Sequence, residues 1–243
     1  MPALIVGNWK MNGLGDDIAE IAQMAAAGAG NGARSLWIAP PFTLIDRSVI
    51  VAAGAVKIGG QDCHVKQSGA HTGCVSAAML ADLGAGFVIV GHSERRRDKA
   101  ESDADVRAKA TAGCAAGLEV ILCIGETRDQ RGAGQTNDVL TSQLAGSLPD
   151  DAEALIIAYE PVWAIGTGLI PTLDDVASAH AHIRANLVAR YGPAGYGVRV
   201  LYGGSVTPAN ASELLRVSEV GGVLVGGASL TAQSLLAITA APP

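Results

Sequence analysis

Short runs of Val, Ile and Leu recur every few dozen residues along the chain, separated by longer and more polar stretches. Each run is too short for a globular helix and rich in β-branched residues, which is typical of a buried strand. The runs are Ala3–Gly7, Ser35–Ala39, Val56–Gly60, Phe87–Gly91, Glu119–Ile124, Ala154–Tyr159, Val198–Leu201 and Gly222–Val225. The stretches between them carry apolar residues at helical spacing, as at Ile18, Ile21, Ala22 and Ala25, or at Val176, Ala179, His180, Ile183 and Leu187. Strand and helix therefore alternate, which predicts parallel strands joined by crossover helices.

Two architectures fit this alternation: a closed (β/α)8 barrel and an open doubly wound sheet. An open sheet that binds dinucleotides carries G-x-G-x-x-G after its first strand, whereas that position here reads GNWKMNGLG. The chain has 243 residues, a length that α/β barrels occupy as one domain, and no linker or charge run divides it. We therefore favour an α/β fold in which residues 1–243 form a single (β/α)8 barrel domain, with the open sheet as the alternative.

The composition narrows the function. Hydrophobic residues make up 49% and charged residues 16%, which excludes a disordered chain, and the net charge of −6 argues against nucleic acid or anionic membranes as main partners. No run of apolar residues is long enough for a membrane span, and no basic segment precedes the first apolar run, so we expect a cytoplasmic protein without a signal peptide. The cysteines lack metal-site spacing and are expected to be isolated, reduced thiols: Cys63, Cys74, Cys114 and Cys123.

The active site of a barrel forms at the carboxyl ends of its strands, and the first strand delivers Asn8, Trp9 and Lys10 there. The alternation of an extended chain predicts that Asn8 and Lys10 share one side. A lysine at this mouth could attract an anion, although an ordinary surface lysine also fits.

The fourth and sixth strands end in groups suited to acid–base chemistry. His92 stands just ahead of a polar segment that could begin a helix, whose N-terminus would disfavour the protonated imidazole; a structural cap is the other reading. Glu160 ends the sixth strand, followed by a segment with the composition of a lid. A carboxylate under a closing lid becomes a stronger base, although an ion-paired glutamate would look the same.

The last two strands end in YGGSV and LVGGASL, and glycine-rich turns ahead of helices are suited to holding phosphate. A cation, a neutral imidazole, a carboxylate and a phosphate cradle together support proton abstraction beside a carbonyl. No metal cluster or nucleotide loop accompanies them, and Cys123 and Ser205 lack a base nearby in the sequence. Such a reaction needs no cofactor.

Six motifs run along the chain: GNWKMN, GHSERR, CIGE, AYEPVWAIGTG, YGGSV and LVGGASL. In these motifs and in their order the sequence resembles the triosephosphate isomerase family over essentially its whole length. The resemblance implies a homodimeric TIM barrel that interconverts dihydroxyacetone phosphate and glyceraldehyde 3-phosphate in glycolysis and gluconeogenesis. It implies that Glu160 moves the proton, His92 polarises the carbonyl, Lys10 neutralises charge and Asn8 donates a hydrogen bond to a substrate oxygen.

The resemblance also assigns supporting residues. Gly166, Ser205, Gly226 and Gly227 would hold the phosphate, Ile165 and Leu224 would cover Glu160, and Glu94, beside Ser93, would orient the lysine. Glu126 and Tyr159 would hold Trp163 when the lid is open, and Tyr202 and Ser205 would catch the lid when it shuts. Ordinary packing is the alternative reading for Trp163 and Tyr202.

The chain departs from the family at residues 61–76, which resemble the loop that enters the neighbouring subunit. His71 stands where an aromatic is usual, and Cys74 replaces a glutamate that pairs with the arginine at Arg95 across the interface. Thr72 is retained, so we expect a homodimer with a weaker or differently wired interface. His71 could make it pH-sensitive, although burial or plain exposure is as plausible.

Two further departures lie at the lid. Leu169 stands where many relatives have lysine, and Pro171 falls where a backbone N–H would receive the Tyr202 hydroxyl, a group that proline lacks. We expect altered lid kinetics without loss of activity. The rival functions are a phosphate-binding barrel with other chemistry, such as an isomerase or lyase of amino acid biosynthesis, and a catalytically silent barrel that serves as a scaffold.

Overall fold

The computed structural model describes residues 2–28, 34–165 and 171–241. Its centre is a closed barrel of parallel strands in which each strand pairs with the next along the chain and β8 pairs with β1. The strands are β1 (Ala3–Asn8), β2 (Arg34–Ala39), β3 (Lys57–Gly60), β4 (Phe87–Val90), β5 (Glu119–Ile124), β6 (Leu155–Tyr159), β7 (Arg199–Tyr202) and β8 (Gly222–Val225). The predicted (β/α)8 barrel is confirmed, no predicted strand bound is wrong by more than one residue, and the open sheet is excluded.

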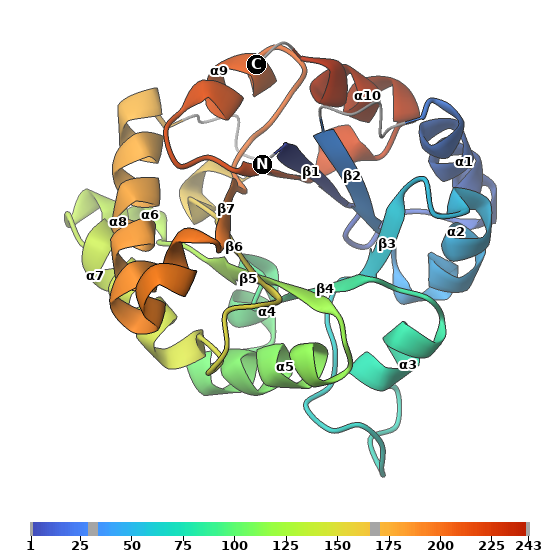
Figure 1. Cartoon of the computed structure of the whole chain (residues 1–243), viewed down its shortest axis with the longest axis horizontal. Coiled ribbons are helices and arrows are strands. Elements are labelled where there is room, and N and C mark those ends of the chain that lie inside the picture. Colours follow the sequence, from blue (N-terminus) through green and yellow to red (C-terminus); the bar gives the residue numbers. More distant parts are fainter. Residues whose placement is uncertain (1, 29–33, 166–170, 242–243) are drawn as a thin grey trace.

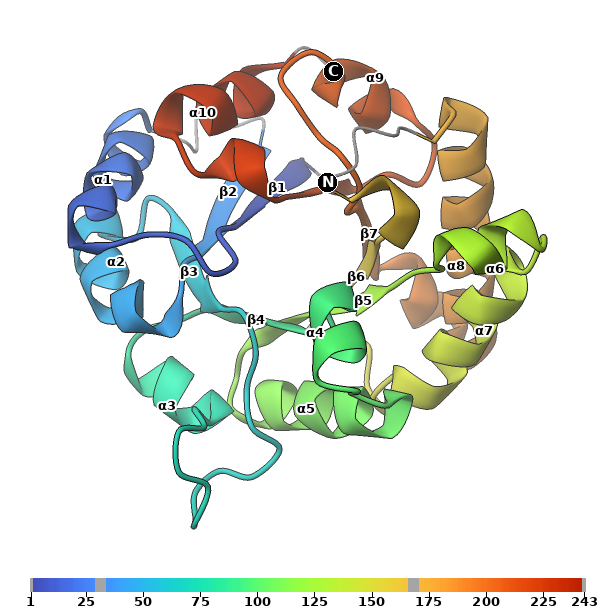
Figure 2. The same ribbon diagram turned by 180° about the vertical axis from the view of Figure 1, so that it is seen from behind.

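Helices surround the strands on all sides (Figure 1). They are α1 (Ile18–Ala26), α2 (Ile45–Ala52), α3 (Ala77–Asp82), α4 (Ser93–Asp98), α5 (Asp103–Ala115), α6 (Arg128–Gly132), α7 (Thr136–Ser147), α8 (Leu173–Tyr191), α9 (Ala211–Arg216) and α10 (Ala232–Ala240). The helical spacing predicted for residues 176–187 corresponds to the buried face of α8. The short α4 follows β4 directly and lies across the end of the barrel that faces the viewer in Figure 2.

The strands are apolar on both faces because both faces are buried. Along β1, Leu4 and Val6 point into the barrel and join an interior cluster with Phe87 and Leu201. Ile5, between them, belongs instead to the larger cluster that packs the strands against the helices. This double burial explains why the strands appear in the sequence as continuous Val/Ile/Leu runs rather than as alternating polar and apolar residues.

The barrel closes where β8 meets β1, and this closure requires a glycine. A Cβ atom on Gly222 would lie 2.0 Å from the carbonyl oxygen of Leu4, far inside van der Waals contact. Any side chain at Gly222 would therefore push the first and last strands apart.

All four cysteines are free. Within the described ranges, no helix combines the length and the apolar character needed to cross a membrane.

His180 on α8 is a buried histidine that makes stability depend on pH. It is fully buried, its Nδ1 lies 3.2 Å from the carbonyl oxygen of Glu219, and its ring meets Tyr159 edge-on at 5.9 Å. Burial lowers its pKa to about 4, against the opposing influence of Glu219, and Arg184 lowers it further. Because the unfolded chain binds this proton below about pH 6.5 and the folded chain does not, stability is full above pH 6.5 and falls as the pH drops towards 4.

We expect the free energy of unfolding to fall by about 2–3 kcal/mol between pH 7.5 and pH 4.5 through this group. Denaturant titrations of the wild type and of His180→Asn at both pH values measure it, because other groups contribute equally to both proteins. Between the two pH values, the free energy of unfolding of the wild type should fall by this amount more than that of His180→Asn. Parallel pH dependence in the two proteins would contradict the expectation.

Candidate active site

The carboxyl ends of β1, β4 and β6 open on the same mouth of the barrel. They bring Lys10, His92 and Glu160 together although up to 150 residues separate them in the sequence. A cavity of about 270 Å³ lies at this mouth, lined in part by Asn8, Lys10, Gln61, His92, Glu94 and Arg95. Among the described residues, no group of three or more His, Cys, Asp and Glu side chains is arranged to hold a metal ion.

Lys10 reaches the mouth by a turn that the sequence did not reveal. The extended chain ends at Asn8, whose side-chain oxygen accepts the N–H of Lys10 at 3.0 Å, and Lys10 itself has a left-handed φ of 55°. The sequence-based prediction placed Lys10 at the mouth by extending the strand alternation to this residue. That reason was wrong, because the extended strand ends at Asn8 and Lys10 lies in a turn. Trp9 does point away: it is buried and donates from Nε1 to the carbonyl oxygen of Ser229.

A left-handed conformation is unfavourable for a lysine, so other contacts must hold it. Gln61, which follows β3, donates from Nε2 to the carbonyl oxygens of Lys10 at 2.8 Å and Ala39 at 2.9 Å. Sequence reasoning assigned no role at the site to Gln61, and its place directly after a strand end was the available signal.

The charge of Lys10 is balanced by Glu94 on α4. Lys10 Nζ lies 2.6 Å from Glu94 Oε1, so this lysine is not an ordinary surface residue. Partial burial by itself raises the pKa of Glu94, but the hydrogen bond from Lys10 and the nearby His92 outweigh it and hold the pKa below its usual value. Glu94 is therefore ionised at neutral pH and forms an ion pair with the lysine.

His92 is the cap of α4, and its hydrogen bonds fix its tautomer. Nδ1 accepts the backbone N–H of Glu94 at 3.2 Å, so the proton of the neutral imidazole sits on Nε2. The side chain is 8% exposed, and Nε2 faces Glu160 Oε1 at 3.1 Å. The predicted helix start at His92 is confirmed, and its geometry presents an N–H donor towards the cavity.

Glu160 lies immediately after β6 and is almost completely buried. Oε2 accepts the backbone N–H of Ser93 at 2.9 Å, while Oε1 lies 3.1 Å from His92 Nε2 but forms no hydrogen bond of good geometry among the described residues. Gly125 makes room for this strand end, since a Cβ there would lie only 1.7 Å from the carbonyl oxygen of Glu160. A buried carboxylate with one oxygen unsatisfied is suited to accept a proton from a ligand.

Neither Cys123 nor Ser205 has surroundings that would activate it as a nucleophile. Burial, followed by the neighbouring carboxylate of Glu160, raises the pKa of the Cys123 thiol. A thiol in such a place stays protonated and inert. Ser205 donates its hydroxyl to the carbonyl oxygen of Ala164 at 2.6 Å, rather than to a base.

The segment after Glu160 is tied to β5 through one carboxylate. Glu126 Oε1 accepts hydrogen bonds from Trp163 Nε1 at 2.9 Å and from the Tyr159 hydroxyl at 3.2 Å. Burial raises the pKa of Glu126, against the effect of these two donors. The structure therefore brings Trp163 together with Glu126 and Tyr159, the two residues predicted to hold it.

The glycine-rich ends of β7 and β8 complete the mouth. Gly226 and Gly227 begin a short turn after β8, and a Cβ on Gly226 would lie 3.5 Å from Lys10 Cε. Asn210 fixes the β7 end by donating to the carbonyl oxygen of Ser205 at 3.1 Å. The turn after β8 thus adjoins the lysine, so an anion held there would feel its charge.

The remaining predicted residues lie as follows. Leu224 belongs to the interior cluster of the barrel, Ile165 is half-buried, and the hydroxyl of Tyr202 is buried without a hydrogen-bond partner in the described part of the chain. Gly166 and Leu169 lie outside the described residues.

Comparison with known proteins agrees with this geometry. The family model for triosephosphate isomerase matches residues 3–241. A triosephosphate isomerase from Ruegeria sp. (strain TM1040) is 57% identical over 240 residues, covering 98% of this chain and 97% of that protein. One from Afipia carboxidovorans is 55% identical over 99% of this chain and 97% of its own. The crystal structure of triosephosphate isomerase from Bartonella henselae matches with a TM-score of 0.92 and 46% identity over 98% of both chains.

Proposed function

The chain belongs to the triosephosphate isomerase family, and on that premise we propose that Glu160 and His92 carry out the chemical step. The enzyme is an aldose–ketose isomerase that interconverts dihydroxyacetone phosphate and D-glyceraldehyde 3-phosphate in glycolysis. The observation that carries the residue assignment is the convergence of Glu160 Oε1 and the Nε2 of His92 at 3.1 Å in the buried mouth of the barrel.

Glu160 is the base. Its carboxylate takes the C1 proton of dihydroxyacetone phosphate, and the C–H electron pair forms the enediolate double bond. The same carboxyl then returns a proton to C2, while the hydroxyl proton moves from O1 to O2 so that the carbonyl forms at C1. The Oε1 of Glu160 supports this role, because it forms no hydrogen bond of good geometry among the described residues that would have to break before the proton is accepted.

His92 and Lys10 stabilise the oxygen on which charge develops. An N–H donor that already points at the oxygen costs no reorganisation when the enediolate forms. The bond from the Glu94 N–H to His92 Nδ1 supports a fixed Nε2–H donor. Lys10 adds positive charge, and Asn8, 5% exposed at the end of β1, donates to a substrate oxygen.

The phosphate is held by backbone N–H groups of Gly166, Ser205, Gly226 and Gly227. The adjacency of Gly226 to Lys10 supports this assignment, because the lysine then attracts the dianion to the same corner. Ile165 and Leu224 cover Glu160 once substrate is bound, which removes water from the base.

Closure of the lid is expected to differ in this chain because Pro171 offers no N–H to the Tyr202 hydroxyl. Pro171→Ala restores that donor, and one hydrogen bond is worth about 0.5–1.5 kcal/mol, so lid opening rates should change by about 2- to 10-fold with activity retained. Trp163 fluorescence after a temperature jump, with 2-phosphoglycolate bound, measures these rates. Unchanged rates in the variant would count against this role for Tyr202.

We also propose a homodimer formed through the 61–76 loop, which projects from the barrel below β3 and α3 in Figure 1. The Cys74 thiol offers no carboxylate, and Arg95 is already engaged within its own chain by Asp62 and Glu101, each at 2.7 Å. The rings of His71 and His64 lie tilted against each other with their centroids 4.1 Å apart, and local desolvation and this neighbour lower the pKa of His71.

Without the carboxylate at Cys74, the dimer should dissociate at a concentration about 10-fold or more above that of a relative with the usual glutamate, since each 1.4 kcal/mol changes Kd tenfold. Sedimentation velocity over a dilution series measures the midpoint. A dimer as resistant to dilution as such a relative would refute the weaker interface.

A coupled assay on both triose phosphates, run with EDTA and without added cofactor, tests the whole proposal. We expect turnover in both directions without any cofactor, and in the cell we place it in the cytoplasm, where the glycolytic triose phosphates occur. Absence of turnover would favour the silent scaffold, and turnover only of another phosphorylated substrate would favour a barrel with different chemistry.

A further inference from the structure

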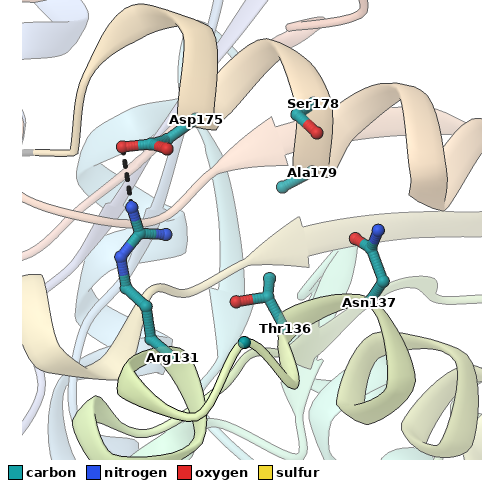
Figure 3. A pocket seen from close by; sticks show the side chains of 7 residues that line it. Arg131, Thr136, Asn137, Asp175, Ser178 and Ala179 are labelled. Carbon is teal, nitrogen blue, oxygen red and sulfur yellow. Dashed lines mark ion pairs between the residues drawn. The ribbon is translucent and has the colours of Figure 1, made fainter.

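Arg131 on α6 contacts two segments that lie far from it in the sequence. Its guanidinium carbon lies over the ring of Trp163, 4.6 Å from the centroid. Its Nη2 lies 2.7 Å from Asp175 Oδ2, in the first turn of α8. Figure 3 shows the arginine rising from α6 towards the carboxylate on the helix opposite. One side chain therefore links β5–α6, the turn after β6, and the start of α8.

The contact with Trp163 fixes the chain that follows Glu160. Trp163 lies in the short turn Val162–Ala164, separated from the proposed base only by Pro161 and Val162. Its indole N–H donates to Glu126. The guanidinium covers the face of the ring, so Glu126 holds the indole at its edge and Arg131 holds it at its face.

The contact with Asp175 fixes the beginning of α8. Asp175 Oδ2 accepts the backbone N–H of Thr172 at 3.1 Å, and the Asp175 N–H donates to the Thr172 hydroxyl at 3.1 Å. The same oxygen receives Arg131, so the guanidinium bonds to the capping box itself. Residues 166–170, between the two contacts, lie outside the described residues.

Packing alone does not hold this arginine in place. A pocket of about 340 Å³ opens beside the pair, lined also by Thr136, Asn137 and Ser178 (Figure 3). The side chains of Arg131 and Asp175 are 31% and 34% exposed, and an ion pair at such a site contributes little to overall stability. The planar guanidinium can stack on the indole and bond to the carboxylate at once, which a lysine ammonium cannot do.

We propose that Arg131 is a positioning residue for the isomerisation, which acts by holding Trp163 and the α8 cap in the relative places that set the orientation of Glu160. This inference rests on the proposed role of Glu160 as the base. A small displacement of a catalytic carboxylate reduces the rate of proton transfer far more than it reduces substrate binding. Loss of Arg131 therefore lowers kcat and leaves KM nearly unchanged, because substrate binding still has the turn at Gly226 and Gly227 beside Lys10.

The experiment compares Arg131→Met, Arg131→Lys and Asp175→Asn with Arg128→Met, an exposed arginine on the same helix. In Arg131→Met we expect kcat to fall by about 10-fold with KM within about twofold, together with a change in tryptophan emission. Arg131→Lys should recover only part of kcat, Asp175→Asn should show a smaller loss, and Arg128→Met should match the wild type.

Thermal unfolding of each variant separates this role from a structural one. The inference is supported if kcat falls while the variant remains folded at the assay temperature. It is overturned if Arg131→Met keeps wild-type kcat and emission, or if its activity falls only with the folded fraction. A fully active Glu160→Gln would instead overturn the proposed base, and this inference with it, whereas an inactive Glu160→Gln beside a fully active Arg131→Met refutes this inference alone.

Discussion

Replacing Glu160 with glutamine is expected to lower kcat by about 10³- to 10⁴-fold while KM changes only a few-fold, because the amide keeps the shape of the side chain but cannot take up a proton. The amide oxygen can still accept the Ser93 N–H, which holds the side chain in the wild type at 2.9 Å. The variant should therefore fold and bind substrate, and the loss should appear almost entirely in the chemical step.

Glu153→Gln is the matched control for this variant. Glu153 is an exposed glutamate just ahead of the same strand β6, at the opposite end from the active-site mouth. It undergoes the same chemical change and should leave kcat and KM at their wild-type values. Coupled assays in both directions measure both variants. Retention of wild-type kcat by Glu160→Gln would exclude this carboxylate as the base.

Replacing His92 with glutamine is expected to lower kcat by about 10²- to 10³-fold, the usual cost of losing one donor to a developing oxyanion. The imidazole separates its acceptor and its donor across a rigid ring, with Nδ1 towards the Glu94 N–H and Nε2 towards the cavity. The shorter glutamine amide cannot reach the Glu94 N–H and the substrate oxygen at the same time. It can therefore make only one of these two hydrogen bonds.

His182→Gln is the matched control, since His182 on α8 hydrogen-bonds Thr141 away from the barrel mouth. Wild-type activity in His92→Gln would show that the donor at this position contributes nothing to the rate.

The fold followed from the sequence because its strongest signals are local. Each strand is a run of β-branched residues buried on both faces, and each run was located to within one residue. The runs do not show whether the sheet closes into a barrel, because the contact of Gly222 with Leu4 joins strands more than 200 residues apart. Only the count of strands and the missing dinucleotide motif pointed to a barrel rather than to an open sheet.

The candidate site was predictable where residues end strands, and not where they lie in turns. Asn8, His92 and Glu160 come at or directly after strand ends, so barrel geometry alone brings them to one mouth. The left-handed turn at Lys10 could not be predicted, because its stabilisation comes from Gln61, a distant residue on another strand end. Contacts such as Arg131 with Trp163 depend on tertiary packing and leave no periodic pattern in the sequence.

The orientation of two side chains towards one substrate is the central claim, and a crystal structure of the protein with 2-phosphoglycolate tests it most directly. We expect the carboxylate of Glu160 and the Nε2 of His92 both to lie within hydrogen-bond distance of the carboxylate end of the ligand, with its phosphate against the turns at Ser205 and Gly226. A ligand that met Glu160 without His92, or that bound elsewhere on the barrel, would contradict it.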